Sequence, residues 1–415
     1  MVGDYMHYIQ RAMERLIVKI TKEYPVILLT GPPQCGKTPM LLKLMDDAKN
    51  GREYVSLDDL TLRALAKNDP VTFFQLHKPP LMIDEVQYAP ELFPYIKMIV
   101  DKNHEPGLFY LAGSQLFKRM EGAKESLAGR VALLHLSPLA NGEILGRQDI
   151  RPFEANLEML SDRQQQNKSV TVTDIFSSIH RGSMPALVSG KYSKPDLFYS
   201  SYIGTYLDRD VKELSGTIDS LKFTRFLTAC AARSSQLLNY KGIGEDAEID
   251  QSTAKSWLRI LETLGIIFYL HPYSNNVLKR VVKTPKLYFY DTGLICYLTR
   301  WTSAETAMNG AMNGALLENY VISEVMKSYQ NEGLNPPLYY YRDKDNKEID
   351  LVIDRDGKLY PIEIKKTAMP DKNLVKVFSV LTSQASILGT GAIVCTVETL
   401  GAFDKDNLIV PIALL

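Results

Sequence analysis

The chain has 415 residues, 45% of them apolar and 23% charged, and its 48 basic side chains equal its 48 acidic ones in number. This length exceeds what one hydrophobic core usually supports, so we expect two or three globular domains. Zero net charge excludes a general attraction to nucleic acid or anionic membranes, so any such binding must come from a local patch. The sequence shows neither a secretory N-terminal pattern nor a run of ~20 apolar residues, which favours a cytoplasmic protein.

Short apolar runs that alternate with helical or turn-rich segments dominate the first third of the chain. Continuous apolar strands joined by crossovers are typical of a parallel sheet with helices on both faces, an α/β architecture. Ligands of such sheets bind at the carboxyl ends of the strands. We expect this first domain to span residues 1–150. Its predicted strands cover residues 26–29, 54–57, 81–83, 108–112 and 131–136.

The phosphate-binding pattern GxxxxGK[ST] follows the first of these strands and precedes a helical segment. Its glycines let backbone N–H groups surround phosphates at a helix N-terminus. Lys37 is expected to neutralise the β- and γ-phosphates during catalysis, and Thr38 to place its hydroxyl on Mg²⁺. Cys35 is interpreted as a small side chain that fills the loop, with a reactive thiol as the alternative. The predicted nucleotide-binding residues are Gly31, Pro32, Pro33, Gln34, Cys35, Gly36, Lys37, Thr38 and Pro39.

A second buried strand ends in two carboxylates, Asp84 and Glu85. This is the Walker B pattern, which lies beside the phosphate-binding loop in P-loop proteins. Asp84 is expected to hold the Mg²⁺ shell, and Glu85 to orient and polarise the attacking water. Two helix-capping carboxylates are the alternative.

Three more candidate catalytic residues follow. Ser114 and Gln115 end the next strand, where a sensor of the γ-phosphate or of the attacking water would lie, and an ordinary strand-to-helix cap is the alternative. Arg130 is a candidate arginine finger for the same chain or for a neighbouring subunit of a homo-oligomer. A surface ion pair is the alternative for Arg130.

Three further regions are predicted after the first domain. The chain becomes polar near residue 151, and we expect a helical lid or linker over 151–225. A helical pattern that ends at Gly265, followed by a strand, indicates a winged helix-turn-helix-like domain over 226–292. Later strands indicate a second α/β unit over 293–415. These strands are expected at 338–341, 349–353, 359–364 and 392–395.

With these motifs in view, the chain resembles a large family of prokaryotic AAA+ ATP-binding proteins that carry a C-terminal domain of unknown function. The resemblance covers nearly the whole chain and implies an AAA+ P-loop core that binds ATP, with no agreed biological role. It rests on residues 54–59, 83–87, 112–114, 127–130, 206–210, 285–293 and 348–350.

The sequence departs from the family pattern at three places. Pro33 stands where Arg is expected, and Pro39 stands where Thr is usual. Gly182-Ser183 has one glycine where two are common. A proline early in a helix is tolerated, so Pro39 need not break the site. The missing Arg leaves the rate of hydrolysis open.

The helix before Gly265, the strand after it and a basic segment at 278–283 are similar to a winged helix-turn-helix. Such a module contacts DNA phosphates through basic side chains. The candidates here are Lys255, Arg259, Lys279, Arg280 and Lys283. The alternative is a packing module whose basic side chains are only solvated.

The order Glu318, Asp350, Glu363, Lys365 is similar to the Glu…Asp…ExK order of the PD-(D/E)XK nuclease superfamily. Glu363 and Lys365 are alternate residues of one strand, so we expect them to point with Asp350 toward a possible second metal site. Metal-assisted phosphodiester hydrolysis is the chemistry that such a cluster serves. An amphipathic strand with one wet face is the alternative.

The sequence therefore predicts an ATPase that uses ATP and Mg²⁺. One hypothesis is an ATP-switched enzyme that processes DNA through its winged-helix and nuclease-like parts. The other is a signal-transducing NTPase whose C-terminal parts bind a protein partner and cut nothing.

Overall fold

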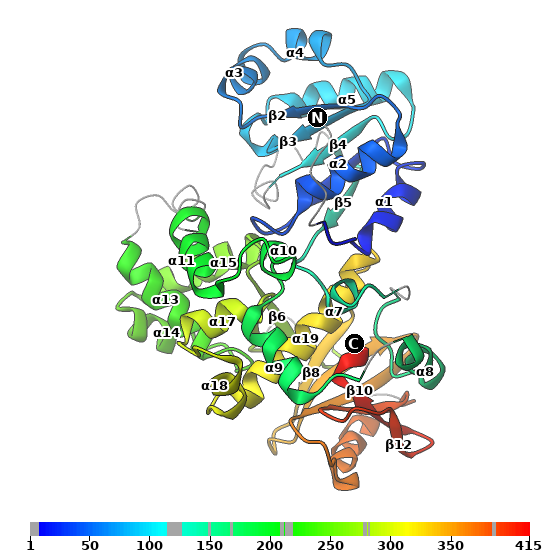
Figure 1. Cartoon of the computed structure of the whole chain (residues 1–415), viewed down its shortest axis with the longest axis vertical. Helices are drawn as coiled ribbons and strands as arrows, with labels where there is room; N and C mark the ends of the chain where they lie inside the picture. Colours follow the sequence, from blue (N-terminus) through cyan, green and yellow to red (C-terminus); the bar gives the residue numbers. More distant parts are fainter. Residues whose placement is uncertain are drawn as a thin grey trace. The chain divides into compact units, whose positions relative to one another are not determined.

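The structure, a computed structural model, describes residues 8–113, 127–147, 151–166, 169–207, 211, 219–276, 280, 283–383 and 387–415. The chain divides into two compact units (Figure 1). The first contains the residues up to Leu139 together with Thr263–Gly265 and Gln330–Leu334, and the second contains the remainder. The finer division at residues 225 and 292 stays a prediction. Within the described ranges, no helix has both the length and the apolar character needed to cross a membrane.

A five-stranded parallel sheet forms the centre of the first unit. Its strands lie in the order β2-β3-β4-β1-β5, and every neighbouring pair is parallel. The strands are β1 (Val26–Thr30), β2 (Glu53–Ser56), β3 (Leu81–Asp84), β4 (Phe109–Ala112) and β5 (Val131–His135). The predicted P-loop NTPase sheet is confirmed, and the loop after β1 and the acidic end of β3 lie at the same edge of it.

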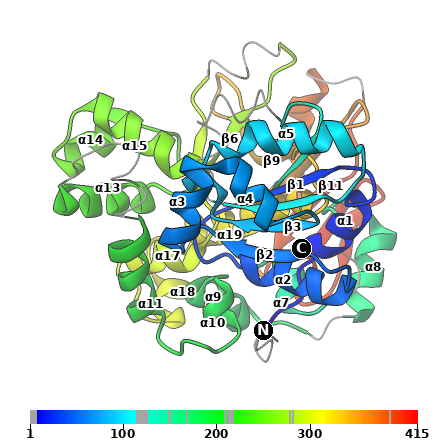
Figure 2. The ribbon, with the colours of Figure 1, turned by 90° about the horizontal axis from the view of Figure 1, so that it is seen from above.

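Helices cover both faces of this sheet (Figure 2). Because successive side chains of a strand point to opposite faces, Val26 and Leu28 pack on one side and Ile27 and Leu29 on the other. The first side lies under α3 (Leu60–Asn68), α4 (Pro70–Leu76) and α5 (Leu92–Asn103), and the second under α1 (Met13–Ile20) and α2 (Lys37–Ala48). Burial on both faces explains why the central strands β1, β3 and β4 read as continuous apolar runs.

The second unit begins with short helices. They are α7 (Asn141–Ile144), α8 (Leu157–Gln166), α9 (Val172–Arg181), α10 (Pro185–Val188), α11 (Pro195–Tyr202) and the π-helical turn η3 (Ile203–Leu207). Farther along the chain are α17 (Thr292–Leu298), α18 (Ala304–Asn309) and the long helix α19 (Asn313–Asn331).

Three helices, α13 (Ser220–Ala232), α14 (Tyr240–Ala247) and α15 (Gln251–Thr263), precede two antiparallel strands. These strands are β6 (Ile267–Pro272) and β7 (Lys286–Phe289). Trp257 of α15 packs edge-on against Phe223 and Phe226 of α13, with ring centroids 5.5 and 5.3 Å away. The predicted helix and the strand that follows it are present. Their use as a DNA-binding winged helix stays a prediction.

An eight-stranded mixed sheet completes the second unit, in the order β12-β13-β11-β10-β9-β8-β6-β7. The strands after β7 are β8 (Leu338–Arg342), β9 (Glu348–Arg355), β10 (Lys358–Lys365), β11 (Gly391–Cys395), β12 (Gly401–Asp404) and β13 (Asn407–Pro411), with 3-10 segments η4 (Lys372–Ser383) and η5 (Ile412–Leu414). Asn319 anchors α19 to β7, because its amide group accepts from the backbone N–H of Phe289 and donates to its carbonyl, both at 2.8 Å.

Buried Asp291 joins two loops of the second unit. Its carboxylate accepts from the Tyr199 hydroxyl at 2.6 Å and from the backbone N–H and the hydroxyl of Ser183 at 2.7 and 3.0 Å. The Ser183 hydroxyl also accepts from the buried Lys327 ammonium at 3.2 Å. Gly182 has a φ of +81°, and a Cβ there would lie 2.0 Å from the Tyr199 hydroxyl oxygen. Only the first position of the Gly182-Ser183 pair thus requires glycine, and the second supplies a hydroxyl to the network.

Gly182→Ala is expected to lower the free energy of unfolding of the second unit by about 3 kcal/mol, since left-handed strain and a steric clash add. Gly190→Ala is the matched control, because Gly190 has a φ of +77° with nothing within 4 Å of the added Cβ. That control is expected to cost about 1 kcal/mol. Both tryptophans, Trp257 and Trp301, belong to the second unit, so urea unfolding followed by tryptophan fluorescence reports it. Equal losses in the two variants would contradict this account of Gly182.

Candidate functional site

The segment between β1 and α2 has the shape of a phosphate-binding loop. Gly36, the N-cap residue just before α2, has a left-handed conformation with a φ of +94°, which a residue with a Cβ rarely adopts. Gly31 has no room for a side chain, because a Cβ would lie 2.2 Å from the carbonyl oxygen of Leu136. The loop leads into the amino end of α2, where backbone N–H groups have no partner within the helix and attract anions.

The first two residues of α2 make different contacts. Lys37 Nζ donates to the carbonyl oxygens of Gly31 and Pro32, at 3.0 and 2.9 Å. Thr38 Oγ1 donates to Asp84 Oδ2 at 2.8 Å. The ammonium group therefore lies over the loop, while the hydroxyl ties α2 to the end of β3. Two motifs that are far apart in the sequence meet here.

Asp84 is a buried carboxylate, 6% exposed. Besides Thr38, the hydroxyl of Tyr54 donates to its Oδ2 at 3.2 Å, and the backbone N–H of Glu85 donates to its Oδ1 at 3.1 Å. Burial raises the pKa of Asp84, and the hydrogen bond from Thr38 opposes that rise. Burial also raises the pKa of Tyr54 to about 12, so its hydroxyl remains a donor at neutral pH.

The donor set fits Mg²⁺. The Asp84 carboxylate and the Thr38 hydroxyl are hard oxygen ligands that already lie within hydrogen-bond distance of each other. A cation beside Asp84 would favour its ionised form, which burial disfavours. The loop, Lys37 and the amino end of α2 likewise fit the phosphates of a nucleotide.

Glu85 follows Asp84 with a left-handed backbone, at a φ of +52°. Its Oε2 accepts from Nε2 of Gln87 at 2.5 Å. Gln87 belongs to η1 (Val86–Tyr88), the short 3-10 turn that leaves β3. The structure thus places Glu85 at the same edge of the sheet as Thr38 and Asp84.

Arg11 is a contact of the loop that the sequence patterns do not reveal. It is 3% exposed, and its guanidinium donates to the carbonyl oxygens of Cys35 at 2.8 Å and Ser137 at 2.7 Å. It therefore joins the phosphate-binding loop to the segment after β5. A single Arg before an amphipathic helix belongs to no recognisable motif, and only the fold shows what it contacts.

The remaining loop residues have ordinary roles. The Cys35 side chain is fully buried in the core beneath the loop, which agrees with the small-filler interpretation. Pro39 is exposed in the first turn of α2, where the absent N–H interrupts no helical hydrogen bond. Pro33 is half-buried, and Gln34 is exposed with a φ of +61°.

Arg130 does not reach the loop of its own chain. Its carbonyl accepts from the N–H of Val26 at 3.3 Å, which places it at the amino ends of the strands, roughly 15 Å along the five-residue strand β1 from Gly31. Its guanidinium pairs with Asp101 of α5 at 2.5 and 3.0 Å, the surface ion pair that was the alternative interpretation. The role of Arg130 as an arginine finger for a neighbouring subunit stays a prediction. Ser114 and Gln115 lie outside the residues that the structure describes.

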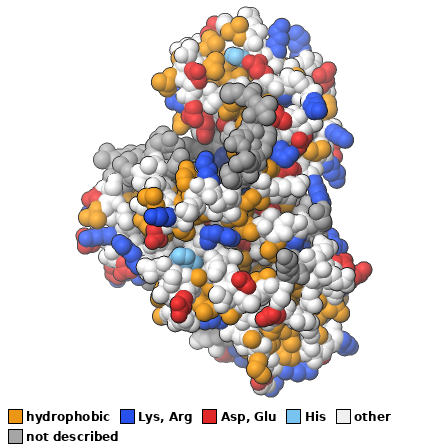
Figure 3. Space-filling model, viewed as in Figure 1, with side chains coloured by type: hydrophobic (Ala, Val, Ile, Leu, Met, Phe, Trp, Pro, Cys, Tyr) orange, Lys and Arg blue, Asp and Glu red, His pale blue; other side chains and the backbone are white. Residues whose placement is uncertain are grey.

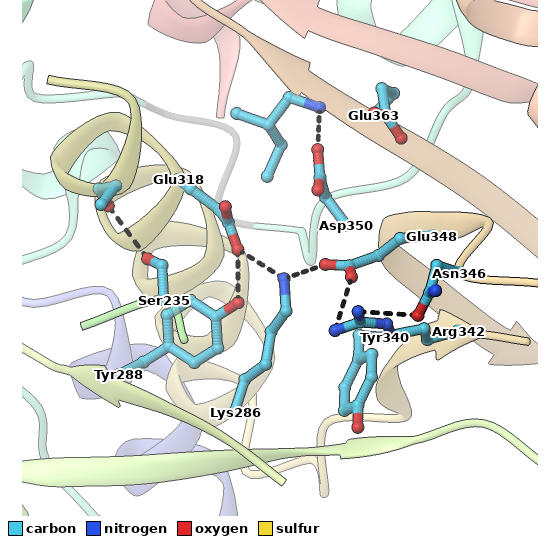
Figure 4. A network of polar contacts seen from close by, with 12 residues as sticks. Ser235, Lys286, Tyr288, Glu318, Tyr340, Arg342, Asn346, Glu348, Asp350 and Glu363 are labelled. Atoms are coloured by element: carbon cyan, nitrogen blue, oxygen red, sulfur yellow. Dashed lines mark hydrogen bonds and ion pairs between the residues drawn. The ribbon is translucent and has the colours of Figure 1, made fainter. Parts of the chain in front are cut away.

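A second polar centre lies in the second unit (Figure 4). Lys286 of β7 is 4% exposed, and its Nζ lies 3.1 Å from Glu318 Oε1 and 2.6 Å from Glu348 Oε1. The Tyr288 hydroxyl donates to the same oxygen of Glu318 at 2.7 Å. Burial alone would lower the pKa of Lys286, but the two carboxylates raise it above its ordinary value. Lys286 belongs to the motif at 285–293 that carries the family resemblance, but no role was predicted for it, because its contacts become visible only in the fold.

The predicted Asp350, Glu363 and Lys365 lie together beside this centre. Lys365 Nζ is 2.6 Å from Glu363 Oε1 and 3.5 Å from Asp350 Oδ2, and the N–H of Ile364 donates to Asp350 at 2.9 Å. The second oxygen of Glu363 is buried without a hydrogen-bond partner among the described residues. Burial, with the nearby Asp350 charge, raises the pKa of Glu363 to about 7.

The possible second metal site at Glu318, Asp350, Glu363 and Lys365 stays a prediction. In the part of the chain that the structure describes, no group of three or more acidic, His or Cys side chains is placed to hold a metal ion. Glu318 is neutralised by Lys286, and Asp350 and Glu363 share Lys365. Among the described residues, these carboxylates are thus paired with lysine ammonium groups, one of which is the predicted Lys365.

The predicted DNA-contacting residues differ in exposure and in their contacts. Lys255, Arg259 and Lys283 are exposed, whereas Lys279 lies outside the described residues. Arg280 is used within the protein: it pairs with Asp354 at 3.1 Å, and its guanidinium carbon lies 4.4 and 4.7 Å from the ring centroids of Tyr273 and Tyr339. On the face shown in Figure 3, acidic and basic side chains are interspersed.

Three regions of the chain match known family models. Residues 23–145 match an AAA domain, residues 172–305 a domain of unknown function (DUF8612), and residues 313–415 another domain of unknown function (DUF4143). An uncharacterized protein of Mycobacterium tuberculosis is 29% identical over 352 residues, which cover 83% of this chain and 71% of the relative. An uncharacterized protein of Methanocaldococcus jannaschii is 24% identical over 328 residues, covering 71% and 66%.

Solved structures with partial similarity to this chain include a Walker-type ATPase and AMPPCP-bound DnaA. The Walker-type ATPase of Pyrococcus abyssi has a TM-score of 0.43 and 13% identity, covering 69% of this chain and 94% of that one. AMPPCP-bound DnaA of Aquifex aeolicus has a TM-score of 0.31 and 15% identity, covering 63% and 89%. Residues 23–145 are therefore similar to an AAA domain and have the parallel sheet of a P-loop NTPase fold, and the regions after them are similar to domains of unknown function.

Arg11→Met is expected to weaken binding of a fluorescent ATP analogue about tenfold, since the carbonyl of Cys35 loses the donor that fixes the loop. Arg52→Met is the matched control. Arg52 is also buried and donates to the carbonyls of Leu81, Gly107 and Leu108, but these lie at the amino ends of β3 and β4. Both variants are expected to lose stability, and only Arg11→Met to lose affinity beyond twofold. Equal affinities would remove Arg11 from the site.

Glu363→Gln is expected to stabilise the second unit more at pH 8 than at pH 5. The pKa of Glu363 is about 7 in the fold against an ordinary 4.5, so its contribution to stability is present below pH 4.5 and is lost as pH rises through 7. The neutral amide has no such loss, and the gain at pH 8 should be about 1–3 kcal/mol. Urea unfolding in the presence of EDTA, followed by tryptophan fluorescence, measures the free energy of unfolding of both proteins at pH 5 and pH 8. A gain that is the same at both pH values would contradict the raised pKa.

Proposed function

We propose that this protein is a Mg²⁺-dependent ATP hydrolase whose site is the edge of the parallel sheet formed by the loop after β1 and the end of β3. The observation that carries the proposal is the 2.8 Å hydrogen bond between Thr38 and Asp84. It joins the Walker A hydroxyl to the Walker B carboxylate at the carboxyl ends of the strands, where such sheets bind ligands. The AAA match over residues 23–145 supports the same assignment.

Each side chain of the site has a separate task in this proposal. Backbone N–H groups of the loop bind the phosphates, and Lys37 exchanges its two carbonyl contacts for phosphate oxygens. Thr38 and Asp84 would hold Mg²⁺, which would supply neutralisation of the phosphate charge. Glu85 orients the attacking water and accepts its proton. Tyr54 and the N–H of Glu85 keep the Asp84 carboxylate in position.

For the second unit, the described contacts bear on two candidate roles, DNA processing and binding of a protein partner. Lys286 neutralises Glu318 and Glu348, and Arg280 is engaged with Asp354, which leaves fewer groups for a metal ion or for phosphates. DNA processing keeps one observation in its favour: Asp350, Glu363 and Lys365 converge on one site, as the nuclease-like order requires.

Three variants test the hydrolase. Lys37→Ala is expected to weaken ATP binding more than tenfold, whereas Glu85→Gln is expected to bind ATP normally and to lower kcat about 100-fold or more. Glu91→Gln, an exposed carboxylate at the start of α5, is the control and should match wild type. Phosphate release with Mg²⁺ or EDTA measures turnover, and a nucleotide titration measures binding.

Duplex DNA in the same assay separates the two roles of the second unit. Turnover that rises with DNA would favour DNA as the working substrate. Turnover indifferent to DNA would favour a protein partner. If wild type binds ATP no better than Lys37→Ala does, the central proposal fails.

A further inference from the structure

Two motifs that carry the family resemblance, residues 83–87 and 112–114, include Gln87 and Gly113, which have no task in the proposed hydrolysis so far. They lie on the adjacent parallel strands β3 and β4, with Ile83 opposite Leu111, so Glu85 and Gly113 occupy corresponding positions just past the strand ends. Gln87 lies between them. Its amide reaches Glu85 on one side and Gly113 on the other.

The Gln87 amide holds Glu85 by one oxygen only. Nε2 donates to Glu85 Oε2 at 2.5 Å. No donor among the described residues contacts the other carboxylate oxygen, Oε1. An ionised carboxylate accepts several hydrogen bonds, so one oxygen can be held while the other accepts from water.

The other end of the amide is pressed against Gly113. Gln87 Oε1 is buried and has no hydrogen-bond partner among the described residues. A Cβ on Gly113 would lie 2.4 Å from this oxygen. Rotating the amide by half a turn would place Oε1 against the Glu85 carboxylate, which repels it, so the negative charge of Glu85 fixes the amide orientation. A buried polar atom kept without a partner calls for an explanation, and such atoms gather at functional sites.

We propose that Gln87 is a positioning residue for ATP hydrolysis: it fixes the Glu85 carboxylate so that Oε1 faces the attacking water, and Gly113 leaves the space that the amide needs. This inference rests on the proposed hydrolase function. Glu85 has a left-handed backbone on a tight turn, and its side chain has no other described hydrogen bond to restrict it. Fixing a general base in one orientation is a large part of what an active site supplies.

Gln87→Met tests the amide directly, because methionine keeps the length and volume but neither donates nor accepts. We expect kcat to fall about tenfold while KM for ATP stays within twofold, since ground-state binding does not involve Glu85. Gln75→Met, at an exposed position on α4 of the same unit, is the control and should leave kcat and KM unchanged.

Gly113→Ala displaces the same amide without removing it. The added methyl meets only the end of a flexible side chain, so the fold should be retained while kcat falls as in Gln87→Met. Combining Gly113→Ala with Gln87→Ala should give no greater loss than Gln87→Ala alone, since the steric conflict is gone. Gly113→Ala and its combination with Gln87→Ala therefore test the proposal even if Gln87→Met does not fold.

A double-mutant cycle shows whether Gln87 acts through Glu85. In single-turnover measurements, Glu85→Gln with Gln87→Met is expected to be no slower than Glu85→Gln alone. If the losses in rate of the two single variants multiply in the double variant, the proposal is wrong. It is also wrong if the kcat of Gln87→Met is within twofold of the wild-type value or higher than it, whether or not KM is raised. If the wild-type protein hydrolyses ATP normally, any of these results contradicts the role of Gln87 and leaves the hydrolase proposal intact. Absence of wild-type turnover would overturn the hydrolase proposal and this inference with it.

Discussion

The nucleotide site depends on one buried carboxylate. Asp84 ends an apolar strand with only 6% of its surface exposed, where an ionised group is costly unless donors or a cation compensate. Thr38, Tyr54 and the backbone of Glu85 supply three donors, from α2, β2 and the turn after β3. Because each donor comes from a different element, the position of Asp84 sets the spacing of the elements that would surround a nucleotide.

The phosphate-binding loop is held in place by contacts from other segments as well as by its own residues. Gly31 allows the Leu136 carbonyl to pass within a distance that no side chain would tolerate, and Arg11 donates to the Cys35 and Ser137 carbonyls. The segment after β5 thus supports the loop after β1 through backbone atoms. Such support fixes a loop without placing a side chain in the space that phosphates would occupy, which is the preorganisation an anion site requires.

Sequence patterns predicted the parts of this protein that follow from periodicity or from fixed spacing. Strands buried on both faces read as continuous apolar runs, and the phosphate loop and Asp84-Glu85 follow such runs directly. Patterns did not reveal the roles of Arg11 and Lys286, because the contacts of a single buried charge become visible only in the fold. They also made Arg280 a candidate for DNA contact and gave no sign that it contacts two aromatic rings and Asp354 within the chain. Only tertiary contacts decide whether a basic side chain faces solvent or the interior.

In the second unit, the balance between carboxylates and cationic side chains affects whether the polar centre can bind a metal ion. Its polar centre contains four carboxylates, Glu318, Glu348, Asp350 and Glu363, and three cationic groups, Lys286, Arg342 and Lys365. With the pKa of Glu363 at about 7, protonation of that one group at or below neutral pH makes the centre neutral. A dication bound by Asp350 and Glu363 would favour the ionised form of Glu363 and would compete with the Lys365 ammonium for the same carboxylate oxygens. Metal binding here would therefore exchange a proton and an ammonium contact for the ion, whereas a structural role keeps the described contacts as they are.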